Sequence, residues 1–560
     1  MFELRGRGLE CLGHVAVAIG AEHFAKYFEF GMQSAKQGLE LNNPTLREHS
    51  FIYFANAAKV MTHAFDAHLP EMVPFLATVI REPELSPFED AESKLAALGA
   101  DDEDDEGDDD EGGQFLLNNA DGFVDTKKAA LTALGALAEH TGKAFYPYLE
   151  STLNEVILNE DGALNSYHRN VRSESLVILE SMVYVACDHF SIPKAQKHQH
   201  IELPLQVAEV SRAVLLSYLT SLDDVEKLPV SSALIGICGV IEKIGVAGLN
   251  LHNLNKSSTI GDILVKKLLL FLQEKAPCQK ISKHEGDEEE DDDDHDNEVM
   301  DSVCDCIGYM SKAVGPAFEI YYRTLHAPLL KFTKSGRPFT DRAMAIGCIA
   351  EVMQELNSAS ILSYLDSFIP VIEVSLQDTM EAVRRNAAFA IGVICFNGGP
   401  ALAAHYLKFL QMLRPLCDRP AAQVVATDVG GADVDNALSA VAKMIQISSD
   451  SIPLQQVLPV IIAALPLRVD FDEALNVYGT LVKLMVAGNA HTISMLPQLL
   501  TCLVQILPPT SQVNDVVKAL VVSGIKSFAS NPQLQSAFAS AYSQITDASI
   551  RTMLDMAINS

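Results

Sequence analysis

A proline that recurs about every 40 residues is the feature that most restricts how this chain can fold. In the C-terminal part of the chain, an apolar residue (arginine in one case), proline and aliphatic residues return at intervals of 42, 45, 44 and 38 residues. These prolines are Pro328, Pro370, Pro415, Pro459 and Pro497, and earlier members are Pro74 and Pro147. A fixed period of this length is typical of chains built from stacked helical units.

A second repeated feature, a glycine in the middle of an apolar helical stretch, lies out of phase with the prolines. It occurs at Gly13, Gly135, Gly236, Gly308, Gly347, Gly392 and Gly479. Because the two patterns alternate, each unit is expected to contain two helices. A glycine inside a helix costs about 1 kcal/mol relative to alanine, so its recurrence predicts that neighbouring helices approach closely there.

A period near 40 residues with two helices per unit predicts an all-α HEAT-repeat α-solenoid of about ten helix pairs over residues 1–560. The absence of Trp and an aromatic content of only 7% agree with helices packed by small and medium aliphatic side chains. Asp378, Val383 and Arg384 form a turn typical of HEAT repeats, and Val171 and Arg172 repeat part of it. We expect these Asp and Arg residues to link adjacent repeats. The chain starts inside a helix of the second type, 4–20, so we also expect a longer solenoid whose cap lies elsewhere.

Two acidic inserts interrupt the repeats, at 99–114 and 284–297, and each falls between the first and the second helix of a pair. Runs of like charge repel one another, so we expect flexible, extended loops that emerge on the same side of the solenoid. The acids that we predict to bind a basic partner are Asp101, Asp102, Glu103, Asp104, Asp105, Glu106, Asp108, Asp109, Asp110, Glu111, Glu288, Glu289, Glu290, Asp291, Asp292, Asp293 and Asp294.

The net charge of the chain is -32, from 41 Lys and Arg against 73 Asp and Glu. This charge argues against direct binding of nucleic acid or of an anionic membrane surface, and favours a basic protein. The two inserts hold 20 of the acids, which leaves a charge of -12 on the rest of the chain. Two interpretations remain open: the inserts attract Lys- and Arg-rich partners, or they are spacers that only keep the solenoid in solution.

No motif of the sequence indicates an enzyme, a cofactor or a metal centre. The ten cysteines are scattered through apolar stretches, as in intracellular proteins with reduced thiols, and Cys304 and Cys306 are spaced too closely for a metal site on one helix. His198 and His200 lack further ligands. The N-terminus does not resemble a signal peptide, and the longest apolar stretch that we identify, 457–467, is too short to span a membrane, so we expect no membrane insertion.

The chain resembles the C-terminal half of the importin-β superfamily of nuclear transport receptors, and within it the importin-four type. The resemblance extends over essentially the whole chain. It rests on the stretches Leu4–Gly13, Phe123–Leu131, Phe145–Glu150, Val383–Gly399 and Ala464–Glu473.

This resemblance implies a carrier that shuttles between cytoplasm and nucleus through the nuclear pore. Its cargo would be basic proteins, typically core histones and ribosomal proteins, and its other partners would be nucleoporins and, in the full-length receptor, the GTPase Ran. Residues on the inner face of such receptors usually come from the second helices. By position and sign, the candidates for cargo binding there are Glu139, Asp301, Asp305, Glu351 and Glu355.

Two other functions also fit these features. The chain can be a HEAT-repeat scaffold that assembles other proteins, like the structural subunit of a phosphatase. It can also be a histone-chaperone-like module that acts through its acidic loops without a transport cycle.

Overall fold

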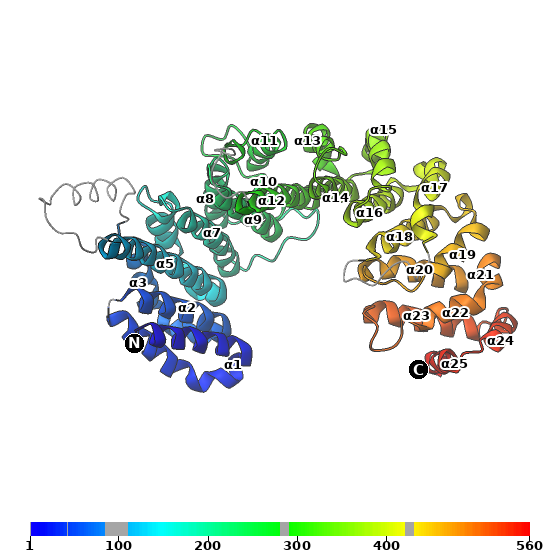
Figure 1. Cartoon of the computed structure of the whole chain (residues 1–560), viewed down its shortest axis with the longest axis horizontal. Coiled ribbons are helices and arrows are strands. Elements are labelled where there is room, and N and C mark those ends of the chain that lie inside the picture. Colours follow the sequence, from blue (N-terminus) through cyan, green and yellow to red (C-terminus); the bar gives the residue numbers. More distant parts are fainter. Residues whose placement is uncertain (1, 42, 84–109, 281–289, 420–429, 560) are drawn as a thin grey trace, which may run out of the picture. The chain divides into compact units, whose positions relative to one another are not determined.

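The computed structural model describes residues 2–41, 43–83, 110–280, 290–419 and 430–559. These residues form helices and connecting segments, and within these ranges the β-structure is one isolated bridge between His252 and Thr259 (Figure 1). The predicted all-α class is therefore confirmed. The chain divides into two compact units, Met1–Val314 and Gly315–Ser560, which are called unit 1 and unit 2 below.

In unit 1, the second helix of each pair packs against the second helix of the next pair. These second helices are α1 (Phe2–Glu40, its part before Gly20), α2 (Pro44–Met61), α5 (Asp110–Thr141), α7 (Arg169–His189), α9 (Lys227–Ile244) and α12 (Glu290–Val314). The first helices cover their other side and are the rest of α1, α3 (Leu69–Ile80), α6 (Tyr146–Ser151), α8 (Leu205–Ser221), α10 (Val246–Leu249) and α11 (Ile260–Leu272).

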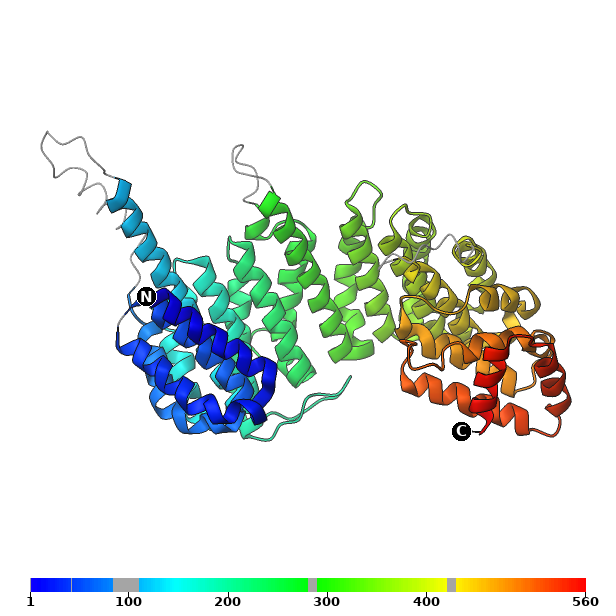
Figure 2. The same cartoon turned by 60° about the horizontal axis from the view of Figure 1, so that its bottom comes forward.

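Unit 2 repeats this arrangement (Figure 2). Its second helices are α14 (Phe339–Glu355), α16 (Glu381–Gly398), α18 (Ala432–Ser448), α20 (Ala474–Val486) and α23 (Asp515–Ser530). Its first helices are α13 (Glu319–Phe332), α15 (Ser358–Ser375), α17 (Tyr406–Cys417), α19 (Leu454–Ala464) and α22 (Leu496–Val504), with the short α21 (Ala490–Ser494) before α22 and α24 (Gln535–Gln544) and α25 (Ala548–Asn559) at the end. The described residues thus contain ten such pairs before α24 and α25, which agrees with the predicted number.

The recurring prolines mark the first helices, as predicted. Five lie inside a first helix and two lie in the first turn of one. They are Pro74 in α3, Pro147 in α6, Pro328 in α13, Pro370 in α15, Pro415 in α17, Pro459 in α19 and Pro497 in α22. A proline inside a helix lacks one backbone hydrogen bond and bends the helix, so the repeat places this disturbance on the same member of each pair.

Most of the recurring glycines allow the close approach of second helices that was predicted. A Cβ atom at Gly135 would lie 2.4 Å from the Cγ2 atom of Ile178 on α7, and one at Gly392 would lie 3.2 Å from the Cα atom of Ala440 on α18. The prediction is wrong for Gly479, where the nearest atom, 3.9 Å away, belongs to the same helix. The repeated glycine therefore predicted correctly which helices are second helices, but it did not predict a close helix–helix contact at every position.

The predicted link between repeats is present as a series of Arg–Asp pairs. Each arginine near the start of a second helix binds an aspartate of the next repeat: Arg172 with Asp224 at 2.8 Å, Arg342 with Asp378 at 2.8 Å and Arg384 with Asp433 at 2.7 Å. Arg172 also donates to the carbonyl oxygens of Ser166 and Tyr167, and Arg384 donates to those of Asp378 and Thr379. Each guanidinium thus holds its own turn and the next repeat together.

The first helix ends at Gly20, as predicted. Gly20 has a non-helical backbone (φ 75°, ψ 171°), and after this bend the second helical part of α1 continues to Glu40. The part after the bend packs on α2, where the hydroxyl of Ser50 donates to the carbonyl oxygen of Ala35 at 3.2 Å. Glycine adopts this positive φ without a steric penalty, so one continuous segment provides helices of two successive pairs.

The apolar stretch 457–467 is not the longest one among the described residues. Residues Glu381–Cys417, which contain α16 and α17, are long and apolar enough to cross a membrane by length and composition alone. Their most apolar window is 56% buried inside the fold, and the backbone is broken at Gly399 (φ 67°). The apolar side chains of α16 are used in packing against α14, α15 and α18, as in the core helix of a helical repeat.

Candidate functional site

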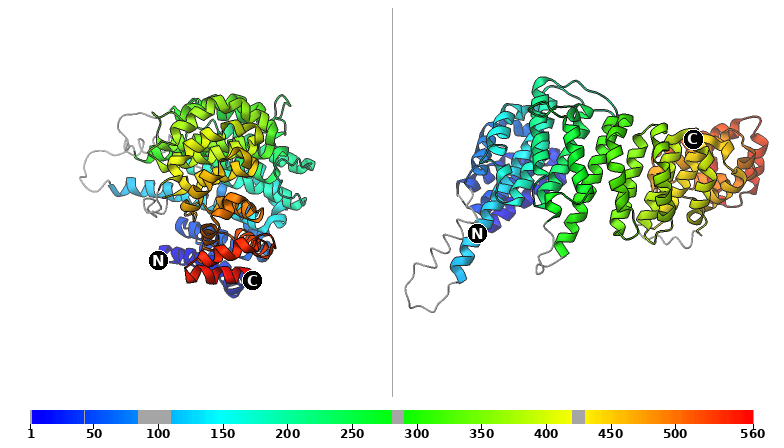
Figure 3. Two further views of the ribbon diagram at one scale, coloured as in Figure 1. Left: turned by 90° about the vertical axis from the view of Figure 1, so that its right-hand side faces the viewer. Right: turned by 90° about the horizontal axis from the view of Figure 1, so that it is seen from above.

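The two predicted acidic inserts lie mostly outside the described residues. This holds for Asp101, Asp102, Glu103, Asp104, Asp105, Glu106, Asp108, Asp109, Glu288 and Glu289. The other members, Asp110, Glu111 and Glu290 to Asp294, were predicted to be extended, but the backbone there already belongs to α5 and α12. Both helices begin on the same side of unit 1 (Figures 2 and 3).

The five acids predicted on the second helices have different environments. Glu139 on α5 and Asp301 and Asp305 on α12 are exposed and belong to unit 1. Glu351 and Glu355 lie on α14 in unit 2. Glu355 is only 4% exposed, because the face of α14 on which it lies is covered. The expectation that Glu355 belongs to an accessible surface is therefore wrong.

Two further carboxylates, Glu180 on α7 and Glu242 on α9, extend the group in unit 1. Burial raises the pKa of Glu180, and the negative charges of Glu139 and Glu242 raise it further, while a hydrogen bond with Tyr184 opposes this shift. Although Asp305 is exposed as a residue, partial burial of its carboxyl group raises its pKa against the attraction of Lys312. We call Glu139, Glu180, Glu242 and Asp305 the acidic surface: four carboxylates from four successive second helices.

Aromatic and aliphatic side chains accompany these acids. Tyr184 hydrogen-bonds to Glu180, and Tyr309 of α12 has its pKa raised by burial and then by Glu242 and Asp305 among its neighbours. Val177 on α7 and Ile235 on α9 are 54% and 59% exposed. Carboxylates beside exposed apolar carbon atoms suit the long aliphatic stems and charged ends of lysine and arginine.

Between α5 and α7 the surface is hollowed into a cavity of about 410 Å³ that contains Glu139, Glu180 and Tyr184 in its lining. A glycine makes room for one of these acids: a Cβ atom at Gly239 would lie 2.1 Å from the Oε1 atom of Glu180. The carboxylate of Glu180 therefore lies directly against the backbone of α9, which accounts for its burial.

Sequence reasoning did not select Glu180 and Glu242, although a signal was present. Each is the single acid in a mainly apolar run of a second helix, Ser175–Tyr184 and Gly236–Ile244. A charged residue in such a run must reach the surface or find a partner. An acid that interrupts an apolar stretch is therefore a signal that could have identified both positions.

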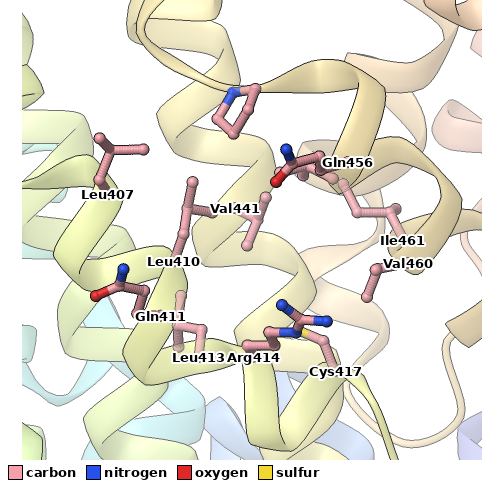
Figure 4. Close-up of a pocket in the computed structure, with 12 residues that line it drawn as sticks. Leu407, Leu410, Gln411, Leu413, Arg414, Cys417, Val441, Gln456, Val460 and Ile461 are labelled. Carbon is pink, nitrogen blue, oxygen red and sulfur yellow. The ribbon is translucent and has the colours of Figure 1, made fainter.

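Unit 2 contains a more apolar groove, of about 440 Å³, between α17 and α19 (Figure 4). Leu407, Leu410 and Val460 line it together with the polar side chains of Gln411 and Gln456. Its only charged lining residue, Arg414, is a cation. The groove does not match the chemistry of the acidic surface, and it lies on first helices.

Metal ligands are not gathered anywhere in the described part of the chain, where no group of three or more His, Cys, Asp or Glu side chains is placed to hold an ion. Of the ten cysteines, nine are buried and Cys11 is exposed, and all ten are free thiols.

Comparison with known proteins gives sequence relatives over nearly the whole chain. A HEAT-repeat family model matches residues 368–398. The chain is 26% identical to the probable importin subunit beta-4 of Schizosaccharomyces pombe over 96% of the chain and 50% of that protein. It is also 26% identical to importin-4 of Homo sapiens, over 92% of the chain and 47% of that protein. The chain thus spans about half the length of these relatives, which are named importins and not enzymes.

Solved structures of the karyopherin Kap121p share the fold. The complex with the SUMO protease Ulp1p aligns with 99% of this chain and 48% of Kap121p, at a TM-score of 0.66 and 14% identity. The complexes with RanGTP and with Nup53p align at TM-scores of 0.64 and 15% identity. In sequence, in its HEAT repeat and in its solenoid fold, the chain is therefore similar to the C-terminal half of a receptor of the importin-4 type.

Proposed function

We propose that this chain is the cargo-holding part of a nuclear import receptor and that it binds Lys- and Arg-rich proteins, such as core histones and ribosomal proteins, on the acidic surface of unit 1. The observation that supports this proposal is the convergence of four carboxylates from α5, α7, α9 and α12. The similarity to importins supports a role in transport, although these relatives are about twice as long as this chain.

The electrostatics of the acidic surface favour a cationic ligand. Three of its carboxylates lie close enough for Glu139 and Glu242 to raise the pKa of Glu180, so these charges repel one another in the unbound chain. A lysine or arginine placed between them relieves this repulsion and forms charge-assisted hydrogen bonds. The binding of a basic partner is therefore favoured by the attraction of opposite charges and also by the relief of repulsion among the carboxylates.

The acids of the two inserts complete the proposal. Asp101 to Glu111 and Glu288 to Asp294 act as anionic arms that raise the rate of encounter with a basic partner over a distance of about 10 Å, the Debye length at 0.1 M salt. The backbone starts of α5 and α12 on one side of unit 1 support a common direction for both arms.

Binding of histones H3 and H4 to purified variants tests the proposal. The variant E139Q/E180Q/E242Q/D305N removes the charge of the acidic surface with little change of shape. A control variant, E71Q/E155Q/E160Q/E209Q, changes the net charge equally at exposed acids of unit 1 outside this surface. Fluorescence anisotropy at about 50 and 200 mM salt should show a loss of affinity of at least about tenfold for the first variant and little loss for the control.

Two results point to the other functions. Equal affinities of both variants and the unmodified chain would contradict binding at the acidic surface and favour a scaffold, above all if pull-downs recover only acidic or apolar proteins. Replacement of 101–111 and 285–296 by Gly/Ser linkers tests the arms separately, and an unchanged rate of association would contradict their role in steering.

Ran, nucleoporins and shuttling between cytoplasm and nucleus belong to the proposal through the importin relatives and the Kap121p complexes with RanGTP and Nup53p. Displacement of bound histone by RanGTP would distinguish a receptor from a histone-chaperone-like module. If RanGTP does not displace histone when the chain is joined to the N-terminal half of a receptor, the chaperone function is favoured instead.

A further inference from the structure

A basic hairpin of the chain itself lies at the edge of the acidic surface. The segment between α7 and α8 contains Lys194, Lys197, His198 and His200 and no acid over residues 191–201, in a chain whose net charge is -32. Figure 2 shows it leaving unit 1 at the end opposite to the starts of α5 and α12.

Three contacts hold this hairpin against the end of α9. The ammonium group of Lys194 forms an ion pair with Glu242, a member of the acidic surface. The backbone N–H of Ala195 donates to the carbonyl oxygen of Lys243 at 2.9 Å. Gly245 (φ 60°) provides the space, because a Cβ atom there would lie 2.8 Å from the Cβ atom of Ala195.

The charge of Lys194 also reaches the next helix. Its positive charge opposes the increase in the pKa of Tyr309 on α12 that Glu242 and Asp305 promote. Lys194 therefore pairs with one acid of the surface, Glu242, and acts on the same tyrosine as a second acid, Asp305.

We propose that residues 191–201 are an internal competitor that occupies the edge of the acidic surface and that a Lys- or Arg-rich partner must displace. This inference rests on the function proposed above and adds to it a means by which the chain sets its own affinity. The competing contact is weak because it is exposed to solvent. The side chains of Lys194 and Glu242 are 61% and 41% exposed, and exposed ion pairs contribute little to stability. Weak competition rejects partners with few cations and permits those that replace several contacts at once.

The test measures binding of a fluorescein-labelled peptide of about twenty lysines to the full chain. The variant K194S/K197S removes the two hairpin lysines, and the control K266S/K275S removes two exposed lysines of unit 1 on and after α11. Because both variants change the net charge by the same amount, any difference between them reports the position of the charges. We expect the hairpin variant to bind about two- to fivefold more tightly than the control at 0.1 M salt.

Hydrogen exchange provides a second measurement that does not depend on affinity. The amide of Ala195 is protected by the carbonyl oxygen of Lys243, so its exchange should become faster when the peptide is bound. Equal affinities of the two variants together with unchanged exchange at Ala195 would overturn the competition, even where the peptide binds. If E139Q/E180Q/E242Q/D305N and its control both bind the peptide as tightly as the unmodified chain does, the proposed function itself is overturned. The two failures are therefore distinguishable.

Discussion

The Nε atom of Arg384 lies 2.7 Å from the Oδ2 atom of Asp433, and the side chain of Asp433 has no exposed surface. The pair joins the start of α16 to the start of α18. Arg419 contacts the same oxygen atom, so the buried carboxylate is held by two guanidinium groups. A charge in such a position is tolerated only because it is fully paired.

Removal of one partner should therefore destabilise unit 2 strongly. We expect R384A to lower the free energy of unfolding by about 3 kcal/mol, because Asp433 keeps only Arg419. The matched control R414A breaks the exposed pair of Arg414 with Asp418, whose side chains are 74% and 45% exposed, and should cost less than about 1 kcal/mol. Urea unfolding followed by circular dichroism gives both values, and a similar midpoint for the two variants would contradict the importance of this link.

A buried histidine predicts how the stability of unit 2 depends on pH. His326 on α13 contacts the hydroxyls of Tyr322 and Ser367, each at 2.8 Å, and burial lowers its pKa to about 4. Because the unfolded chain then binds the proton at a higher pH than the folded chain does, stability is lost as the pH falls below about 6.5.

Between pH 7 and pH 5 this effect should amount to about 2 kcal/mol. The variant H326Q, which does not titrate and keeps hydrogen-bonding atoms, should remove that part of the pH dependence. Urea unfolding of both proteins at the two pH values is the measurement. Parallel changes in both would show that other groups cause the loss.

The raised pKa of Glu180 predicts that mild acid weakens the binding of a basic partner. Burial is the main cause of the increase in pKa. The hydrogen bond from Tyr184 opposes the increase, and repulsion from Glu139 and Glu242 adds to it. Glu180 therefore takes up a proton at a higher pH than an ordinary glutamate does, and one negative charge of the acidic surface is then lost.

Affinity for the labelled lysine peptide should fall as the pH is lowered from 7 to 5, and E180Q should bind more weakly at pH 7 with a smaller dependence on pH. Protonation of Glu180 favours the folded state, since its pKa is higher there, so weaker binding at pH 5 is not explained by unfolding through this group. Identical pH profiles for the chain and for E180Q would exclude Glu180 as the titrating group.

Two glycines of the same repeated pattern should respond oppositely to alanine. At Gly135 the new Cβ atom would lie 2.4 Å from Ile178, so α5 and α7 must separate, and we expect a loss of about 1 to 3 kcal/mol. At Gly479 the nearest atom is 3.9 Å away, and the higher helix propensity of alanine should stabilise α20 by up to about 1 kcal/mol. Thermal unfolding of G135A and G479A gives the sign of each change, and equal shifts would contradict the packing difference.

The acidic surface was only partly predictable from sequence. Glu139 and Asp305 were found by position, because the second helices follow from the repeat. Glu180 was not, since its place depends on Gly239 of the next second helix, which leaves room for its carboxylate. Glu355 was predicted to be accessible but is 4% exposed, because the exposure of a helix face depends on which elements cover it.

The sequence by itself determined the period, the two helices of each pair and the order of proline and glycine helices, because each of these depends on residues close together in the chain. It also predicted that Asp and Arg residues link adjacent repeats, because the same turn motif recurs. The gathering of Glu180 and Glu242 with Glu139 and Asp305, and the hairpin contact of Lys194 with Glu242, were decided only by the tertiary structure. These contacts join residues that lie about 40 or more positions apart. Their formation depends on how closely adjacent helices pack, which a local pattern does not specify.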